Sequence, residues 1–451
     1  MANKVIPHSI NDWSPIDENE GFWGKINLLN PNQNFGIHEY NGKLWSSGLV
    51  GVGHLFDING NPIFENGEEH ILVVTSRYGL SPWRMLEKVM EDDEYDDYME
   101  ELHRQNKYLY QIFHDQPLIA LPREANSKEE LLYAISYINS CFSLCKKGLK
   151  KSIVYKSENY TAKLRGKIDI TKNVKYNTAR GRSDKFYCKY LDFTEDNIEN
   201  RIVKACLLKC KKILLNKSLD IPKMNEKSMY CLNTLRHVKN KKITMSDFSE
   251  ASVTGLYSYY KPVLQQARAI LGCQSNSYSE SLSTSNKKTY TIPFVINMET
   301  LFEFYVRTIL KKSLNSNEYM LDKYSERIYL QADVNRGSNA EKGIHLMQYC
   351  IPDVIICRKD SKKPVMVIDA KYKPDDKPVR EDSHQLLSYV LLTGVKRCGF
   401  VFPGKTTIIK NMESTKNNYL LLKADGVRYY EIILGSNNDV ETIVNFIENT
   451  I

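Results

Sequence analysis

The chain has 451 residues, too many for one ordinary hydrophobic core, and this length predicts two or three domains. Its hydrophobic fraction of 42% and charged fraction of 26% are typical of a soluble globular protein. No run approaches the ~18 apolar residues of a transmembrane helix, and Met1–Asp12 lacks the apolar core of a signal peptide. We therefore expect a cytoplasmic protein without a membrane partner. The net charge of +8 weakly favours a partner rich in phosphates.

The first region, residues 1–150, mixes short β-like runs with turn sequences such as Asn59-Gly60 and Asn66-Gly67, and it is predicted to be rich in β-structure. An acidic run, Glu91–Glu101, lies within it. This run fits either the solvated face of a helix or a contact surface for a basic protein. DNA is not expected to bind there, because like charges repel.

The ten cysteines are scattered along the chain, and the closest pairs, Cys141/Cys145 and Cys206/Cys210, are spaced i,i+4 within helical patterns. A structural zinc site usually needs a Cys-x-x-Cys turn with a second pair of ligands, and the sequence contains no such set. The cysteines are therefore predicted to be buried free thiols that fill apolar space.

The second region, residues 151–288, is predicted to be a basic, partly helical domain. Lysines and arginines between Lys150 and Lys189 alternate with tyrosines and Phe186, a combination that suits phosphate neutralisation and base stacking but also occurs on solvated strands and loops. After Asp196 the pattern becomes helical. The Ser/Asn-rich stretch Gln274–Lys288 has no periodicity and is predicted to be a linker.

The third region, residues 289–451, has the predicted element order α-β-β-β-α-β. The helices are expected at Met298 to about Leu314 and at about Ser383–Leu392. The strands are expected at Tyr349–Cys357, Pro364–Tyr372, Cys398–Phe402 and about Tyr419–Leu422. Such an order predicts an α/β sandwich around a small mixed sheet, within a chain that is α+β overall.

Two adjacent strands of the third region carry the residues with the strongest chemical content. Asp353 precedes the first, and the second ends in Asp369-Ala370-Lys371. Because strand side chains alternate between faces, Asp369 and Lys371 are expected side by side. One or two carboxylates suffice to hold Mg²⁺, which assists phosphodiester hydrolysis, and a neighbouring lysine can orient or deprotonate the attacking water. An Asp-x-Lys sequence alone would more often be a surface ion pair.

Three further residues accompany this pattern. Glu303 is an acid within an apolar helical run and is expected to assist the metal, although a solvent-facing position is an alternative. Gln385 and Tyr389 lie at i,i+4 on the following helix and so share a face. They are expected to support the site or to contact the DNA backbone.

The ordered set Glu303, Pro352-Asp353, Asp369-Ala370-Lys371 and Gln385-x-x-x-Tyr389 resembles the PD-(D/E)XK nuclease superfamily, and the last element resembles its RecB-like branch. More specifically, the chain resembles the McrC family, the nuclease subunit of McrBC-type restriction systems. Further likeness lies in Leu164-Arg165-Gly166-Lys167-Ile168-Asp169 and Asn197–Arg201, with a looser match around Trp83–Leu86.

The resemblance implies a Mg²⁺-dependent (or Mn²⁺-dependent) endonuclease that cuts double-stranded DNA in defence against foreign DNA. Asp353, Asp369 and Glu303 would be its metal ligands, and Lys371, Gln385 and Tyr389 would complete the site. It also implies that residues 1–150 dock onto a separate McrB-like AAA+ GTPase, which binds the GTP. Arg165 and Lys167 are expected near DNA or that partner. Two alternatives are a modification-protected system that cuts unmethylated sites and a non-catalytic adaptor between a GTPase and DNA.

The segment Gly399–Thr406 matches the P-loop pattern letter by letter. A P-loop is a flexible loop followed by a helix. Here the intervening residues are apolar and end in Pro403, and the β-branched run Thr406–Ile409 follows. We therefore predict a buried strand at this position and no nucleotide binding by this chain.

Overall fold

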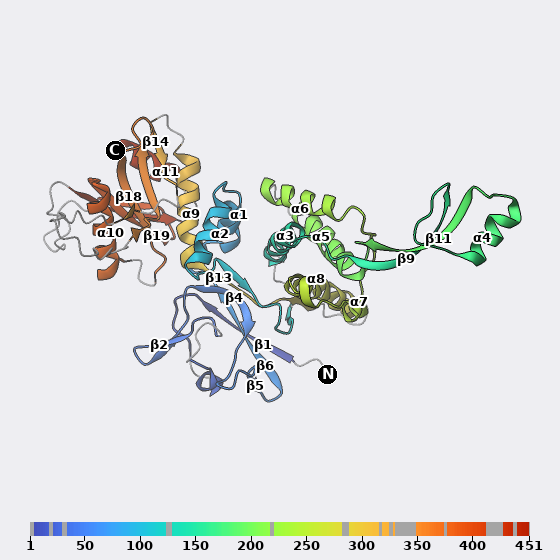
Figure 1. Ribbon diagram of the computed structural model, residues 1–451. Coiled ribbons are helices and arrows are strands. Elements are labelled where there is room, and N and C mark those ends of the chain that lie inside the picture. Colours follow the sequence, from blue (N-terminus) through green and yellow to red (C-terminus); the bar gives the residue numbers. More distant parts are fainter. Residues whose placement is uncertain are drawn as a thin grey trace, which may run out of the picture. The chain divides into compact units, whose positions relative to one another are not determined.

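The computed structural model describes residues 4–17, 21–28, 34–122, 129–216, 221–281, 288–314, 318–323, 328–329, 349–373, 377–411, 427–435 and 440–450. The chain folds into two compact units, shown in sequence colours in Figure 1. Unit 1 combines Met1–Phe113 with Pro293–Ile451, and unit 2 is His114–Ile292. These boundaries differ from the expected divisions at residues 150 and 288. The predicted mixture of helices and sheets is confirmed.

The first sheet of unit 1 joins the two sequence segments of this unit. Its order is β1-β6-β4-β13-β7, and β5 pairs with β6 at its side. The strands are β1 (Lys4–Asn11), β4 (Leu49–His54), β5 (Phe64–Glu65), β6 (Glu68–Thr75), β7 (Tyr110–Ile112) and β13 (Phe294–Asn297). Beside it lie the hairpin β2 (His38–Tyr40) and β3 (Lys43–Trp45), with short 3₁₀ turns at Gly21–Lys25 and Arg77–Gly79. The N-terminal region is thus rich in β-structure, as predicted.

Glycine is required where β4 meets β13. Gly51 has φ of +156°, and a Cβ atom at this position would lie 2.1 Å from the carbonyl oxygen of Phe294. The pairing of β13 with β4 and β7 brings the start of the C-terminal half against residues 49–112. This non-local pairing explains why the unit is not continuous in sequence.

The acidic run of unit 1 pairs with a helix from the same chain. Helix α1 spans Pro82–Met90 and α2 spans Tyr95–Arg104, while α9 spans Met298–Ser313 as predicted. Three basic residues of α9 form ion pairs with this run, namely Lys312–Glu91 (3.0 Å), Lys311–Asp92 (3.0 Å) and Arg307–Glu94 (3.0 Å). The acids at the N-terminal end of the run are therefore paired within the chain. They are neither a simple solvated helix face nor a contact surface for another, basic protein.

The second sheet of unit 1 has the order β14-β17-β18-β19-β21-β20. Its strands are β14 (Tyr319–Leu321), β17 (Val354–Arg358), β18 (Pro364–Ala370), β19 (Arg397–Gly404), β20 (Ile408–Asn411) and β21 (Arg428–Gly435). Helix α10 (Arg380–Thr393) packs on it through Leu386, Tyr389 and Val390. Figure 1 shows the sheet between α10 and α9, and α11 (Val440–Thr450) follows β21. The predicted α/β sandwich is present, and a small two-stranded sheet pairs β15 (Ile328–Tyr329) with β16 (Tyr349–Cys350).

Residues 399–404 of the P-loop-like segment belong to the buried strand β19, as predicted. At Gly399 a Cβ atom would lie 2.5 Å from the carbonyl oxygen of Tyr430 on the neighbouring strand, so glycine here serves strand packing. The next element is strand β20, where a P-loop would have a helix. The predicted strand at 419–422 lies outside the described residues.

Unit 2 is built mainly of helices. They are α3 (Glu129–Lys147), α5 (Ile198–Asn216), α6 (Pro222–Thr234), α7 (Met245–Glu250) and α8 (Tyr260–Ser281), with a 3₁₀ turn at Gly255–Tyr257. A small sheet pairs β8 (Ile119–Pro122) with β12 (Lys288–Thr291). The prediction of a linker over Gln274–Lys288 is wrong in its first half, because α8 continues to Ser281. Ser and Asn lower helix propensity only modestly, and the helix extends through them.

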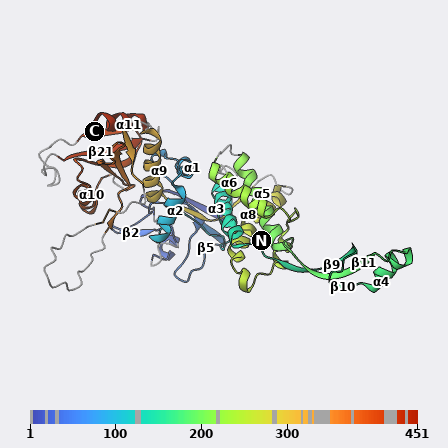
Figure 2. The same cartoon turned by 45° about the horizontal axis from the view of Figure 1, so that its top comes forward.

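An arm, defined as residues 152–194, extends from the helices of unit 2 in both views (Figures 1 and 2). It contains β9 (Ser152–Thr161), β10 (Lys167–Ile168), α4 (Ile170–Tyr176), a 3₁₀ turn at Thr178–Arg180 and β11 (Lys185–Thr194), in the sheet order β10-β11-β9. Large apolar side chains are exposed along the arm, including Ile153, Tyr155, Ile170, Leu191 and Phe193.

Candidate active site

The candidate site lies at one end of the β17–β18 hairpin in unit 1. Asp353 comes immediately before β17, and the antiparallel pairing sets Val354 opposite Ile368. This register brings Asp353 next to Asp369, near the end of β18. The backbone N–H of Ala370 donates a hydrogen bond to Asp353 Oδ2 at 2.8 Å. The hairpin thus fixes the orientation of one carboxylate beside the other.

Asp369 and Lys371 project to the same side, as strand alternation predicts. Lys371 Nζ lies 2.8 Å from Asp369 Oδ2. The Asp369 side chain is fully buried; Oδ1 has no hydrogen-bond donor, and Oδ2 is contacted by the Lys371 ammonium. A buried carboxylate normally has its oxygens satisfied, so this ion pair leaves acceptor capacity unused.

Negative charge is crowded at this site. Burial raises the pKa of Glu303 and that of Asp353 to about 7, with repulsion from Asp369 adding to the first and repulsion from Glu303 to the second. Burial and the neighbouring Asp353 raise the pKa of Asp369 well above its usual range.

The lysine responds in the opposite sense. Burial disfavours the Lys371 ammonium, but attraction by Asp369, Asp353 and Glu303 outweighs it, and the pKa of Lys371 is raised. Lys371 is therefore a cation and a hydrogen-bond donor at neutral pH. A single ammonium faces three carboxyl groups, so the site favours additional positive charge.

Gln385 and Tyr389 continue the site as a chain of hydrogen bonds from helix α10. Lys371 Nζ donates to Gln385 Oε1 (3.3 Å), Gln385 Nε2 donates to the Tyr389 hydroxyl (2.5 Å), and that hydroxyl donates to the carbonyl of Ile351 (3.4 Å). Gln385 is exposed, whereas Tyr389 is buried. The chain links the lysine to the segment that carries Asp353, which favours a supporting role for the pair.

Helix α9 contributes Glu303 and, one turn later, Arg307. Glu303 is partly buried and lies close enough to Lys371, Asp369 and Asp353 for its charge to act on them. Arg307 is 2% exposed and donates from Nη1 to the backbone carbonyl of Asp353 (3.3 Å). Its Nη2 also donates to Glu94 (3.0 Å). The helix therefore supplies one acid directly and holds the backbone of another.

Two neighbours of the site were not predicted. Glu299 lies one turn before Glu303. Burial raises the pKa of Glu299, and the charges of Lys373, Lys107 and Lys371 partly offset this rise. The i,i+4 spacing of Glu299 and Glu303 is the sequence pattern that could have indicated that both side chains lie on the same helix face. Lys107 also acts on Glu303. It follows α2, far away in sequence, and nothing in its local pattern connects it to the site.

The residues fit a hard divalent cation. The candidate ligands are all carboxylate oxygens, which Mg²⁺ prefers, and the buried Oδ1 of Asp369 has no hydrogen-bond donor. The crowding of acids would be relieved by such a cation. Within the described part of the chain, the three carboxylates are not all within 4.8 Å of one another, since the one group that meets this criterion consists of cysteines.

Arg165 and Lys167 belong to the arm of unit 2. Arg165 pairs with Asp192 (3.2 Å) and lies over the ring of Tyr190 (3.9 Å from the centroid). Lys167 is exposed in β10. Their role near DNA or a partner remains a prediction.

The comparisons with known proteins assign a family. The model described as "McrBC 5-methylcytosine restriction system component" matches residues 84–403, a range that covers most of the chain and includes the positions of the candidate residues. The chain belongs to the McrBC family. No curated protein matches it.

Two solved structures resemble this McrBC family member weakly. A half-complex of Thermococcus gammatolerans McrB AAA+ hexamers with bound McrC covers 99% of this chain and 100% of its own, at 14% identity and a TM-score of 0.39. The T. gammatolerans McrBC complex covers 69% and 89%, at 12% identity and a TM-score of 0.30. The family assignment rests on the family model and not on these scores. Among the described residues of the McrBC chain, no helix is both long and apolar enough to cross a membrane.

Proposed function

We propose that this McrBC family chain is the Mg²⁺-dependent DNA endonuclease subunit of a restriction system and has a PD-(D/E)XK active site. The observation that carries the proposal is the Asp353–Asp369–Lys371 cluster, in which a buried carboxylate beside an ammonium retains one oxygen, Oδ1, without a hydrogen-bond donor. A structural ion pair would not need the second carboxylate, Asp353, whose repulsion adds to burial in raising the pKa of Asp369. The family to which the chain belongs supports the assignment.

In this proposal Asp353 and Asp369 hold the metal, and Glu303 assists them. Mg²⁺ supplies Lewis-acid stabilisation of the negative charge that develops on the phosphoryl oxygens. The charged form of Lys371 donates a hydrogen bond to the phosphate or orients the attacking water. The raised pKa of Lys371 favours donation over proton abstraction, since a general base must be deprotonated at the working pH.

Gln385 and Tyr389 act as positioning residues in the proposed site. Their hydrogen bonds restrict the Lys371 ammonium and the segment before Asp353. Precise placement matters, because small displacements of a catalytic group can cost ~100-fold in rate. A direct contact of the exposed Gln385 with the DNA backbone is compatible with the same geometry.

We further propose that the chain works with an McrB-like AAA+ GTPase, which binds the GTP and switches on cleavage. The family assignment and the McrB hexamers in the T. gammatolerans assembly motivate this partner. Residues 1–150 are the docking region expected from the sequence. The arm offers a second candidate, because exposed large apolar side chains such as Tyr155 (85% exposed) and Ile170 (74%) commonly mark binding surfaces.

Plasmid cleavage by the assembled complex, with its GTPase, GTP and Mg²⁺, tests the proposed function. Asp369→Ala and Lys371→Ala are expected to abolish cutting. Asp360→Ala and Lys363→Ala are matched controls, since both residues are exposed in the turn of the same hairpin, and they should cut like the wild type. Full cutting by either site variant would place the chemistry elsewhere. A wild-type complex that cuts neither methylated nor unmethylated DNA would favour the adaptor alternative.

A further inference from the structure

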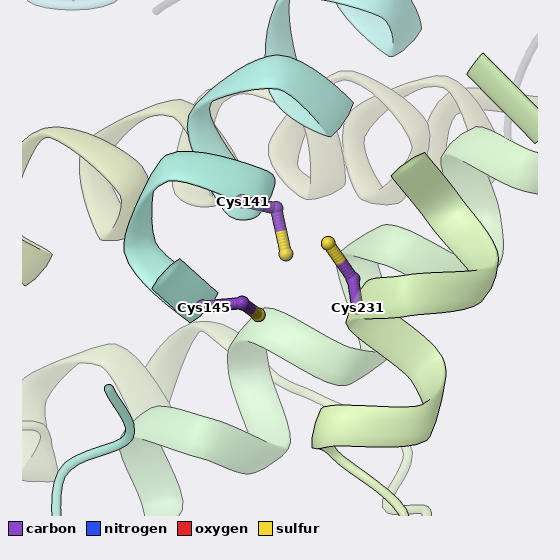
Figure 3. Close-up of side chains that lie close together, drawn as sticks. All are labelled: Cys141, Cys145 and Cys231. Carbon is purple, nitrogen blue, oxygen red and sulfur yellow. The ribbon is translucent and has the colours of Figure 1, made fainter. Parts of the chain in front are cut away.

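Three cysteines from two helices of unit 2 converge in its core. Cys141 and Cys145 lie one turn apart on α3, and Cys231 lies on α6, which packs against α3. All three are buried, with exposed fractions of 0%, 5% and 0%. Figure 3 shows the three side chains directed toward a common point between the helices. The i,i+4 pair was recognisable in the sequence, but its third member is more than eighty residues away.

The spacing of the sulfur atoms is close to that of metal ligands. The three Sγ atoms lie within 4.8 Å of one another. Thiolates bind Zn²⁺ at ~2.3 Å, so two sulfurs on one ion are roughly 3.8–4.0 Å apart. Side-chain rotation would therefore need to move each sulfur by less than about an ångström.

The chemistry of the cluster selects a soft ion. Thiolates select Zn²⁺, Cu⁺ and similar ions over Mg²⁺ or Ca²⁺, which need oxygen ligands. Within the described residues, no histidine, aspartate, glutamate or further cysteine joins the three within the same distance. Cys206 and Cys210 on α5 form a second buried i,i+4 pair that does not belong to the group. They provide an internal comparison of equal burial and spacing.

We propose that Cys141, Cys145 and Cys231 form a binding site for one thiophilic metal ion, with Zn²⁺ as its ion, which ties α3 to α6. Three protein ligands leave one position of a tetrahedral Zn²⁺ ion for a water molecule. The ion would replace the protons of the thiols, so binding releases protons and strengthens as the pH rises. This site is separate from the proposed nuclease site in unit 1, takes a different class of metal, and does not depend on cleavage activity.

Metal binding by the full-length chain tests the site. The chain is stripped of metal under reducing conditions and titrated with Cd²⁺, whose thiolate complexes give an ultraviolet charge-transfer band. We expect saturation at one ion per chain, competition by Zn²⁺, and protection of three thiols from a thiol-reactive reagent. Zn²⁺ should also raise the melting temperature of the wild type.

Variants separate this site from ordinary buried thiols. Cys231→Ser and Cys145→Ser should lose the band and the Zn²⁺-dependent stabilisation, whereas Cys210→Ser should keep both. Cys231→Ala serves if the serine variant does not fold, as judged by circular dichroism. A folded wild type that binds neither Cd²⁺ nor Zn²⁺ would overturn the proposal and leave the cysteines as packing residues. Retention of the full band in folded Cys231→Ser or Cys231→Ala would overturn it as well.

Discussion

At the level of single residues, Asp369 is a fully buried carboxylate whose Oδ1 has no hydrogen-bond donor. Its ion pair with Lys371 does not compensate for the adjacent Asp353, and the pKa of Asp369 is raised well above its usual range. Active sites often retain such unfavourable arrangements, because the same charges bind a ligand. The Asp369 carboxylate is therefore expected to destabilise the metal-free protein and to stabilise the protein when the proposed metal is bound.

Replacing Asp369 with Asn is expected to stabilise the metal-free protein and to remove its response to Mg²⁺. The neutral amide has nearly the same shape and eliminates a buried charge beside Asp353. In a thermal melt with chelator, Asp369→Asn should unfold at a higher temperature than the wild type. Added Mg²⁺ should raise the melting temperature of the wild type only. An equal response of both proteins to Mg²⁺ would argue that Asp369 is not a ligand.

Asp196 in unit 2 forms an ion pair with Arg201, the last residue of the family-like sequence Asn197–Arg201. This pair gives that part of the sequence a structural role. Arg201 binds both carboxylate oxygens of Asp196, at 2.7 and 2.9 Å, and lowers the pKa of Asp196 to about 2. A carboxyl group with a depressed pKa stabilises the fold above its unfolded pKa of ~3.9, and this contribution disappears as the pH falls toward 2.

Asp196→Asn is accordingly expected to cost ~2 kcal/mol of unfolding free energy at pH 7. The difference from wild type should shrink below pH 4. Urea unfolding of the two proteins at pH 7 and at pH 3 measures both quantities. A difference that stays constant over this range would show that the carboxylate charge is not responsible.

At the scale of elements, α9 connects the acidic run of unit 1 with the candidate site. Arg307 is buried, pairs with Glu94 and holds the carbonyl of Asp353. The sequence predicted this helix correctly, and it also showed the acidic run. It could not show that the two meet, because the partners lie more than 200 residues apart and each alone resembles a solvated charged surface.

Replacement of Arg307 by Leu should destabilise the protein by about 3 kcal/mol, because Glu94 and the carbonyl of Asp353 would both lose a buried donor and Lys311 (3.4 Å) would be left to pair with Glu94. The double variant with Glu94→Gln should recover part of this loss. Denaturant unfolding of the single and double variants gives the coupling free energy directly. If the two losses simply add, the ion pair does not couple these elements.

The arm carries the residues predicted to lie near DNA or a partner. Gly166 has φ of +72°, and a Cβ atom there would lie 2.5 Å from the carbonyl oxygen of Lys189, so glycine is needed for β10 to pair with β11. Asp169 accepts a hydrogen bond from the N–H of Lys172 at the start of α4 and pairs with Lys189 (3.0 Å). Gly166 and Asp169, two residues of the family-like sequence around Arg165, therefore stabilise the structure of the arm.

If Arg165 and Lys167 contact phosphates, replacing both with alanine should lower the salt dependence of DNA binding by the complex. Each lost phosphate contact changes the slope of log K against log salt by ~0.9 for B-DNA. Filter binding or fluorescence anisotropy at several salt concentrations measures this slope. An unchanged slope together with weaker GTPase binding would assign these residues to the protein partner.

At the scale of the whole molecule, sequence patterns predicted local structure well and long-range assembly poorly. The β17–β18 hairpin, α9 and α10 follow from local periodicity, and strand alternation was enough to pair Asp369 with Lys371. The boundaries of the units did not follow, because β13 pairs with strands some 180 and 240 residues earlier in the chain. The third cysteine of the thiol cluster and Lys107 were missed for the same reason.

We propose that this McrBC family chain cleaves DNA at the site of Asp369 while a separate subunit hydrolyses GTP. We would measure plasmid cutting and GTP hydrolysis together, in complexes of the cognate GTPase with wild type, Asp369→Ala or Asp360→Ala. We expect equal GTP hydrolysis in all three complexes and cutting in all except the Asp369→Ala complex. Cutting by the Asp369→Ala complex at the wild-type rate would contradict it.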